Sequence, residues 1–145
     1  MPTPPVEAAD EAEAAQVAEA ARKRLDKEEH CLRELRVFLR EVLRVLDRER
    51  RFRPFWQPVD PEEVPDYYTI VKQPMWLALM QQRVDRRRYL CAEEFLEDLA
   101  LVVRNAEEYN PASDARGRQI VHAAHAMQDT VLSMVYRFRR RVGFP

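Results

Sequence analysis

A tyrosine, an asparagine and a proline follow one another at residues 109–111, within the stretch NAEEYNPASDARG. The proline pushes the residue before it out of helical geometry, so a helix that carries Tyr109 ends at Asn110. The Asn110 side chain is uncharged and has both donors and an acceptor, which suits it to bind a neutral polar group such as a carbonyl. An asparagine is also an ordinary residue at a helix end, and Asn110 taken alone favours that interpretation.

A second candidate segment is FRPFWQPVDPEEVPDYYTIVKQP, residues 52–74, which has five prolines and neither helical nor strand periodicity. Connections this long are uncommon in compact domains and are often binding loops. Its apolar and aromatic side chains can form the walls of a slot, and its acidic side chains can form a negative rim. The wall residues are Phe55, Val59, Val64, Tyr67 and Tyr68. The acidic residues are Asp60, Glu62, Glu63 and Asp66.

A slot of this kind needs few polar groups to orient a ligand. Asn110 offers an amide N–H, and Tyr67 offers a hydroxyl that acts directly or through water. Neither group is charged, so the buried tip of the ligand is expected to be neutral. The acidic rim favours a ligand that is cationic elsewhere. An acetylated lysine within a basic histone tail has both properties.

Helices must position these groups, because two glycines in 145 residues argue against a fold rich in tight turns. Apolar residues at helical spacing predict an all-α fold of four helices. We expect a long loop between the first and second helices. The predicted helices run from about residue 27 to the DRERRFR run, from Pro74 to about Val84, from Ala92 to Tyr109, and from about Arg116 to Arg140.

The first residues have a different composition from the rest of the chain. Residues 1–26 are rich in alanine and glutamate and lack an apolar stripe, so we predict a disordered or marginally helical tail there. Residues 27–142 form the predicted domain. The hydrophobic content of 46% is enough for one core, and no apolar run is long enough to cross a membrane. The N-terminus does not resemble a signal peptide, and an intracellular compartment is expected.

Several kinds of chemistry find no support in the residues. Two glycines leave no phosphate-binding loop, so no nucleotide cofactor is expected. His122 and His125 have a spacing that can bind metal but no further ligand near them in sequence, and no metal site is predicted. Cys31 and Cys91 lack a partner or a local base. We therefore predict no catalytic residue and no enzyme activity.

Arginine accounts for most of the positive charge and recurs in the clusters RERRFR (48–53), RVDRRRY (83–89) and RFRRRV (137–142). Such clusters contact nucleic acid in some proteins and only solvate helix ends in many others. Weak, sequence-independent DNA contact is thus a hypothesis, with the densest run at Arg137, Arg139, Arg140 and Arg141.

Taken together, the run VDPEEVPDYYTIVKQPM, the later YL, the NAEEYNP helix end and a closing helix resemble a bromodomain, the four-helix acetyl-lysine reader. With LRELRVFLREV and RFRPF added, the chain is most similar to the bromodomain of the nuclear AAA-ATPase family, known as ATPase family AAA-domain-containing proteins. The resemblance covers roughly residues 28–140. It implies a left-handed four-helix bundle, a nuclear, monomeric domain, and acetylated H4 or H3 histone tails as partners.

The resemblance also implies roles for individual residues. Asn110 would donate to the acetyl carbonyl, Tyr67 would act through water, and Ile120 would be the gatekeeper. The other implied pocket residues are Val59, Val64, Tyr109 and the RPF shelf formed by Arg53, Pro54 and Phe55. The implied acidic rim consists of Asp60, Glu62, Glu63 and Asp114.

Four residues depart from the family pattern. Trp76 replaces an acidic residue, and Cys91 replaces a capping serine or threonine. Ala112 and Gly117 occupy rim positions that tend to be acidic, which predicts weaker binding of basic tails.

Two classes of function remain open at this point. One is a reader of acetylated histone tails; the other is a helical protein-interaction or nucleic-acid-binding domain that uses its arginine clusters. Phosphate binding weakens steeply with salt, whereas amide recognition in a slot does not, so salt dependence distinguishes them.

Overall fold

The computed structural model describes residues 5–143. The chain divides into two compact units, residues 1–34 and residues 35–145, and each is considered by itself. Helix α1, Pro5–Arg48, contributes its first part to the first unit and its last part to the second. The helix therefore begins well before the apolar stripe that predicted a start near Lys27.

The described part of the first unit is a helix with nearly all side chains exposed, including Val17 and Leu25, which are 64% and 63% exposed. Ion pairs between successive turns, such as Arg33 with Glu29 at 3.9 Å, are the only side-chain support that this surface offers. Pairs of this kind stabilise a helix by only about 0.3–0.5 kcal/mol each. The division into a tail of residues 1–26 and a domain of residues 27–142 stays a prediction, and residues 1–4 lie outside the described residues.

Removing residues 1–25 is expected to leave the melting temperature within about 2 °C of the full chain, because the described side chains there bury almost no apolar surface. Thermal unfolding followed by circular dichroism at the helix signal measures this. As a control, Leu39→Ala, which empties a site only 1% exposed, should lower the melting temperature by at least several degrees. A comparable fall on truncation would show that the tail stabilises the domain.

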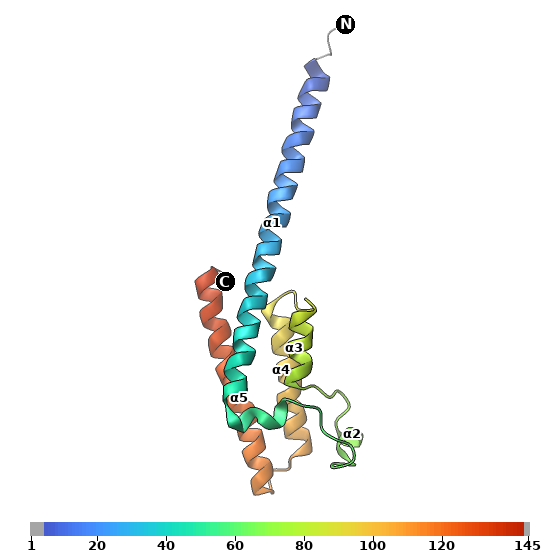
Figure 1. The fold of residues 1–145 in the computed structure, drawn as a ribbon, viewed down its shortest axis with the longest axis vertical. Helices are drawn as coiled ribbons and strands as arrows, with labels where there is room; N and C mark the ends of the chain where they lie inside the picture. Colours follow the sequence, from blue (N-terminus) through green and yellow to red (C-terminus); the bar gives the residue numbers. More distant parts are fainter. Residues whose placement is uncertain (1–4, 144–145) are drawn as a thin grey trace. The chain divides into compact units, whose positions relative to one another are not determined.

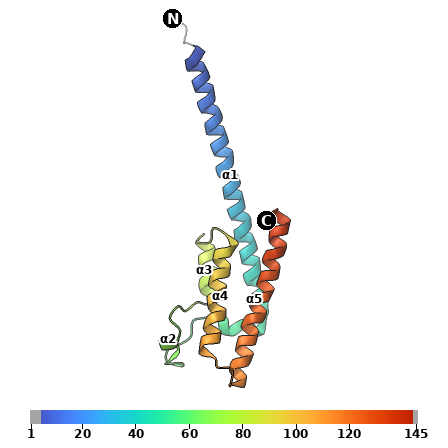
Figure 2. The ribbon, with the colours of Figure 1, turned by 180° about the vertical axis from the view of Figure 1, so that it is seen from behind.

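The second unit is a bundle of four helices. They are the last part of α1, α3 at Leu77–Asp85, α4 at Ala92–Tyr109, and α5 at Ala115–Val142. α4 packs against both α3 and α5, and these helices lie side by side in both views (Figures 1 and 2). Residues 5–143 contain no strand, so the all-α prediction is confirmed.

The long connection after α1 is more ordered than its sequence suggests. It contains the 3-10 helix η1, Arg50–Phe55, and the short helix α2, Tyr67–Ile70 (Figure 1). η1 packs against α5, and α2 packs against α4. The connection is therefore held at both ends to the bundle that it follows.

Helix α3 begins at Leu77 and not at Pro74, which corrects the predicted start. Trp76 is the N-cap in an extended conformation, with φ −147° and ψ 158°. The Ala78 N–H donates to the Trp56 carbonyl at 3.0 Å, which ties the first turn of α3 to the end of η1. Trp76 is therefore extended, and residues 74–76 form a segment outside any helix.

The core of the second unit is built from the apolar stripes of the four helices, such as Leu77, Met80 and Val84 of α3, which are all buried. A large buried side chain contributes about 1.5–3 kcal/mol through its burial. The large side chains less than 2% exposed are Phe95, Leu39, Leu43, Leu46, Leu77, Met80, Leu99, Met127, Val42, Val71, Val84 and Val131.

Candidate ligand-binding site

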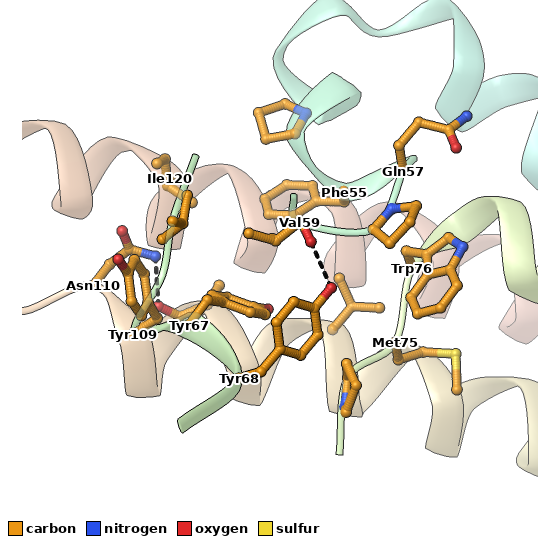
Figure 3. Close-up of a pocket in the computed structure, with 16 residues that line it drawn as sticks. Phe55, Gln57, Val59, Tyr67, Tyr68, Met75, Trp76, Tyr109, Asn110 and Ile120 are labelled. Atoms are coloured by element: carbon orange, nitrogen blue, oxygen red, sulfur yellow. Dashed lines mark hydrogen bonds between the residues drawn. The ribbon is translucent and has the colours of Figure 1, made fainter. Parts of the chain in front are cut away.

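A cavity of about 180 Å³ lies between the long connection, the end of α4 and the first turns of α5 (Figure 3). Apolar and aromatic side chains dominate its walls. The lining residues are Pro54, Phe55, Gln57, Pro58, Val59, Val64, Tyr67, Tyr68, Pro74, Met75, Trp76, Val102, Ala106, Tyr109, Asn110 and Ile120. A concave apolar site with few polar groups is the usual form of a small-ligand pocket.

Asn110 is the C-cap of α4, as its place before proline predicts. Its side-chain Nδ2 donates to the Ala106 carbonyl at 2.9 Å, and its backbone N–H donates to the same oxygen at 3.0 Å (Figure 3). One N–H of the side-chain amide therefore has an acceptor within the protein before any ligand enters. The nitrogen carries two hydrogens, and the bond uses one and fixes the orientation of the amide.

Gly117 lies against Asn110 in the first turns of α5. A Cβ atom placed on Gly117 would lie 3.1 Å from the Asn110 Cβ and 3.2 Å from the Pro111 carbonyl oxygen. Both contacts are tighter than ordinary van der Waals distance, and both neighbours are rigidly attached to the backbone. The absence of a side chain at Gly117 therefore permits α5 to approach the end of α4 and sets the position of Asn110.

Three tyrosines form one wall. The Tyr67 ring makes edge-on contacts with Tyr68 and Tyr109, at centroid distances of 5.2 and 5.1 Å. Burial raises the pKa of Tyr67, and its neighbours Tyr68, Glu108 and Tyr109 raise it further. The Tyr109 hydroxyl donates to Asp66 at 2.9 Å, and this bond raises the pKa of Tyr109. Both hydroxyls are therefore protonated donors at neutral pH.

The valine side of the cavity is held by a compact turn. The Val64 N–H donates to the Asp60 carbonyl at 2.9 Å, and the Asp60 carboxylate accepts from the Glu62 N–H at 2.9 Å. The Tyr68 hydroxyl donates to the Val59 carbonyl at 2.6 Å, and this bond joins α2 to the loop before it (Figure 3). These bonds place Val59 and Val64 on the cavity and leave the acidic side chains outside it.

The predicted acidic rim divides into two groups. Asp60, Glu62 and Glu63 are exposed beside the valine-lined loop. Asp114 is the N-cap of α5, and its carboxylate accepts from the Gly117 N–H at 3.2 Å. Asp114 thus has a structural task in addition to any contact with a ligand.

The far end of the cavity was not anticipated. Gln57, Met75 and Trp76 lie there, opposite Asn110 (Figure 3). The extended segment that carries Met75 and Trp76 is held to α4 by Asn105, whose Nδ2 donates to the Gln73 carbonyl at 2.8 Å. Asn105 is 4% exposed and is the one buried polar residue of the described chain. An asparagine on the apolar side of a helix stripe was the only signal for it in the sequence.

Eight of the nine pocket residues implied by the resemblance line the cavity, as does Tyr68, whereas Arg53 does not. Phe52 and Phe55 are both buried, because residues three apart share a face of a 3-10 helix. Arg53 lies between them and is exposed. The polar shelf expected from Arg53 is therefore absent from the cavity wall, although the roles of the other eight residues stay predictions.

Within residues 5–143 no three side chains of the His, Cys, Asp and Glu types gather as a metal site would require. His125 instead lies 3.1 Å from Glu107. No helix in the same range is long and apolar enough to cross a membrane.

Comparison with known proteins gives three further findings. The family model described as Bromodomain matches residues 39–123. The chain is 44% identical over 118 residues to "ATPase family AAA domain-containing protein 2" of Homo sapiens, covering 81% of this chain and 8% of that protein. It is 42% identical over 121 residues to the human protein 2B of the same name, covering 83% of this chain and 8% of that protein. The chain thus spans less than a tenth of the length of these two relatives.

A solved structure has the same fold. The bromodomain from human BAZ1A superposes with a TM-score of 0.60 and 28% sequence identity, over 68% of this chain and 88% of that one.

Proposed function

The chain belongs to the bromodomain family, and we propose that its cavity binds acetyl-lysine in acetylated histone H4 or H3 tails. Bromodomain membership implies acetyl-lysine reading in general. The observation that supports the finer proposal is the fixed amide of Asn110 at the edge of an apolar cavity, with one N–H bonded to Ala106 and the other left for a ligand.

Acetylation changes the lysine side chain in the two ways that this cavity requires. It removes the positive charge, whose burial among apolar walls without a partner would cost several kcal/mol or more. It also adds a carbonyl, which can accept the second N–H of Asn110. The methyl group and the aliphatic stem then contact apolar side chains such as Val59, Val64 and Ile120. The protonated hydroxyl of Tyr67 donates to the same carbonyl through a bridging water.

The surroundings favour a basic peptide. Asp60, Glu62 and Glu63 are exposed beside the cavity, and histone tails are rich in lysine and arginine. Exposed pairs of this kind contribute at most about 1 kcal/mol each and are screened by salt. We propose that they raise the association rate, while the cavity supplies the selectivity for the acetyl group.

In this proposal the chain is a nuclear, monomeric reader domain, and it performs no catalytic step. Its task is to bring whatever it is attached to onto acetylated chromatin. The ATPase function named in its relatives is not assigned to this chain.

Calorimetric titration with paired H4 and H3 tail peptides tests the proposal. The acetylated form of at least one peptide is expected to bind, and its unacetylated form is expected to give no measurable heat. Moderate salt should weaken the acetylated complex only slightly, because the deciding contacts are uncharged. Equal binding of both forms, with a steep salt dependence, would show that the acidic surface and not the cavity holds the tail.

A further inference from the structure

A second cavity, about 650 Å³ and open to solvent, lies between η1 and the first turns of α5. We call it the η1–α5 groove. Its lining residues are Arg51, Ala115, Arg118, Gln119, His122 and Ala123. Two guanidinium groups and an imidazole thus converge on one concave surface, and none of the lining residues is acidic.

The guanidinium groups are held by partners that leave donors available. Arg118 donates to the Ala112 carbonyl at 2.6 Å, a neutral acceptor that orients the side chain and leaves its charge uncompensated. Arg51 lies 3.4 Å from Glu49, an exposed pair that water and salt screen. Each guanidinium has five N–H donors, so both retain several for a ligand. The nearest other carboxylate along α5, Asp114, accepts from the Gly117 N–H.

The groove and the acetyl-lysine cavity share η1 and α5 but lie on different sides of α5. Ile120 lines the cavity, whereas Gln119 and His122 line the groove. At about 100° per residue, these two side chains lie roughly 100° and 160° around the helix from Ile120. One short peptide segment cannot occupy both sites without passing around the helix.

We propose that the η1–α5 groove binds the phosphate backbone of DNA. Arginine presents planar, bidentate donors that match phosphate geometry, and an open groove accommodates successive phosphates of a continuous strand. If the cavity holds a histone tail, as proposed above, DNA is the polyanion next to that tail, and two faces of α5 would then contact the two components of a nucleosome.

The C-terminal arginines of α5 are the alternative, but three of the four are in contact with groups outside the groove. Arg139 pairs with Glu93. Arg140 lies over the Tyr136 ring and Arg141 over the Phe138 ring, with centroid distances of 5.9 and 5.5 Å. Arg51 also lies over a ring, that of Phe52 at 5.4 Å, but Arg51 and Arg118 line one open cavity together, and this convergence favours the groove as the phosphate site.

The test is the fluorescence anisotropy of a short, labelled, mixed-sequence DNA duplex titrated with the full chain. Arg51→Gln with Arg118→Gln is expected to weaken DNA binding about tenfold at low salt. It should also reduce the slope of log affinity against log salt by about 1.8, because two phosphate contacts are lost. Arg51→Lys with Arg118→Lys keeps both charges and should retain most of the affinity.

The matched control is Arg137→Gln with Arg140→Gln, which removes the same charge from the C-terminal end of α5. This control should keep most of the DNA affinity, and the glutamine pair in the groove should keep its affinity for an acetylated peptide. Binding of the acetylated peptide by the glutamine pair therefore distinguishes a failure of the DNA proposal from a failure of the acetyl-lysine proposal.

The proposal is overturned by any of three results. The first is that the wild-type chain does not bind DNA at low salt. The second is that the C-terminal control loses as much DNA affinity as the glutamine pair in the groove, or more. The third is that a phosphorylated histone peptide binds more tightly than DNA and depends on Arg51 and Arg118, while DNA binding does not depend on them.

Discussion

Replacing Asn110 with alanine is expected to weaken binding of an acetylated histone tail roughly 5- to 150-fold. The substitution removes the N–H that meets the acetyl carbonyl and leaves that carbonyl buried without a direct partner, which costs about 1–3 kcal/mol. Titration calorimetry with the acetylated peptide measures the loss. Binding of the unacetylated peptide should not change.

The fold is expected to survive this substitution with a small cost. The side chain of Asn110 loses its bond to the Ala106 carbonyl, which contributes about 0.5–1.5 kcal/mol, but the backbone N–H keeps its bond to the same oxygen. Pro111 still ends α4. Ser113→Ala, in the same connection and exposed, is the control and should change neither binding nor stability. If Asn110→Ala unfolds the domain, Asn110 is a structural cap first; if it binds the acetylated peptide normally, the recognition role is wrong.

Asn105→Ala is expected to lower the free energy of unfolding by about 1–3 kcal/mol. The side chain is 4% exposed and its Nδ2 donates to the Gln73 carbonyl, so truncation leaves that carbonyl unpaired and opens a void beside it. Chemical unfolding by urea measures the change. The affinity for the acetylated peptide should also fall, because the segment with Met75 and Trp76 loses its attachment to α4.

The control for this prediction is Gln73→Ala. The acceptor at this position is the backbone carbonyl, and the Gln73 side chain is exposed, so truncating it keeps the bond and should leave stability within about 0.5 kcal/mol. Equal stability of Asn105→Ala and the wild-type chain would show that water replaces the amide at no cost.

The helices were predictable because local rules decide them. The α4 bounds, Ala92–Tyr109, agree with the prediction, since an apolar stripe ends at a proline that cannot continue it. The predicted bounds of α5 differ from those in the structure by one residue at its start and two at its end. The apolar stripe of α1 predicted the part of the helix that packs in the core, whereas the start at Pro5 has no apolar stripe to indicate it.

The path of the long connection was not predictable by the same rules. Its turns are fixed by bonds between distant residues, such as Tyr68 to Val59 and Ala78 to Trp56. Periodicity carries no information about such bonds. The family resemblance supplied the cavity residues near Asn110 but not Gln57, Met75 and Trp76. Met75 and Trp76 follow Gln73, whose carbonyl is bonded to Asn105 of α4, and periodicity does not predict such a bond. The resemblance supplied Arg53, but its exposure follows from the three-residue period of η1, which buries Phe52 and Phe55 and which the sequence pattern did not predict.

Gly117 restricts which residues are tolerated at the junction of α4 and α5. It is absent from the cavity lining and supplies no atom to a ligand, so a list of contact residues would mark it as free to vary. Every other amino acid, however, brings a Cβ atom to about 3.1 Å from the Asn110 Cβ and 3.2 Å from the Pro111 carbonyl oxygen, which is tighter than ordinary van der Waals contact. An acidic side chain at this position, which the family resemblance leads one to expect on the rim, would therefore need Asn110 and Pro111 to shift by a few tenths of an ångström.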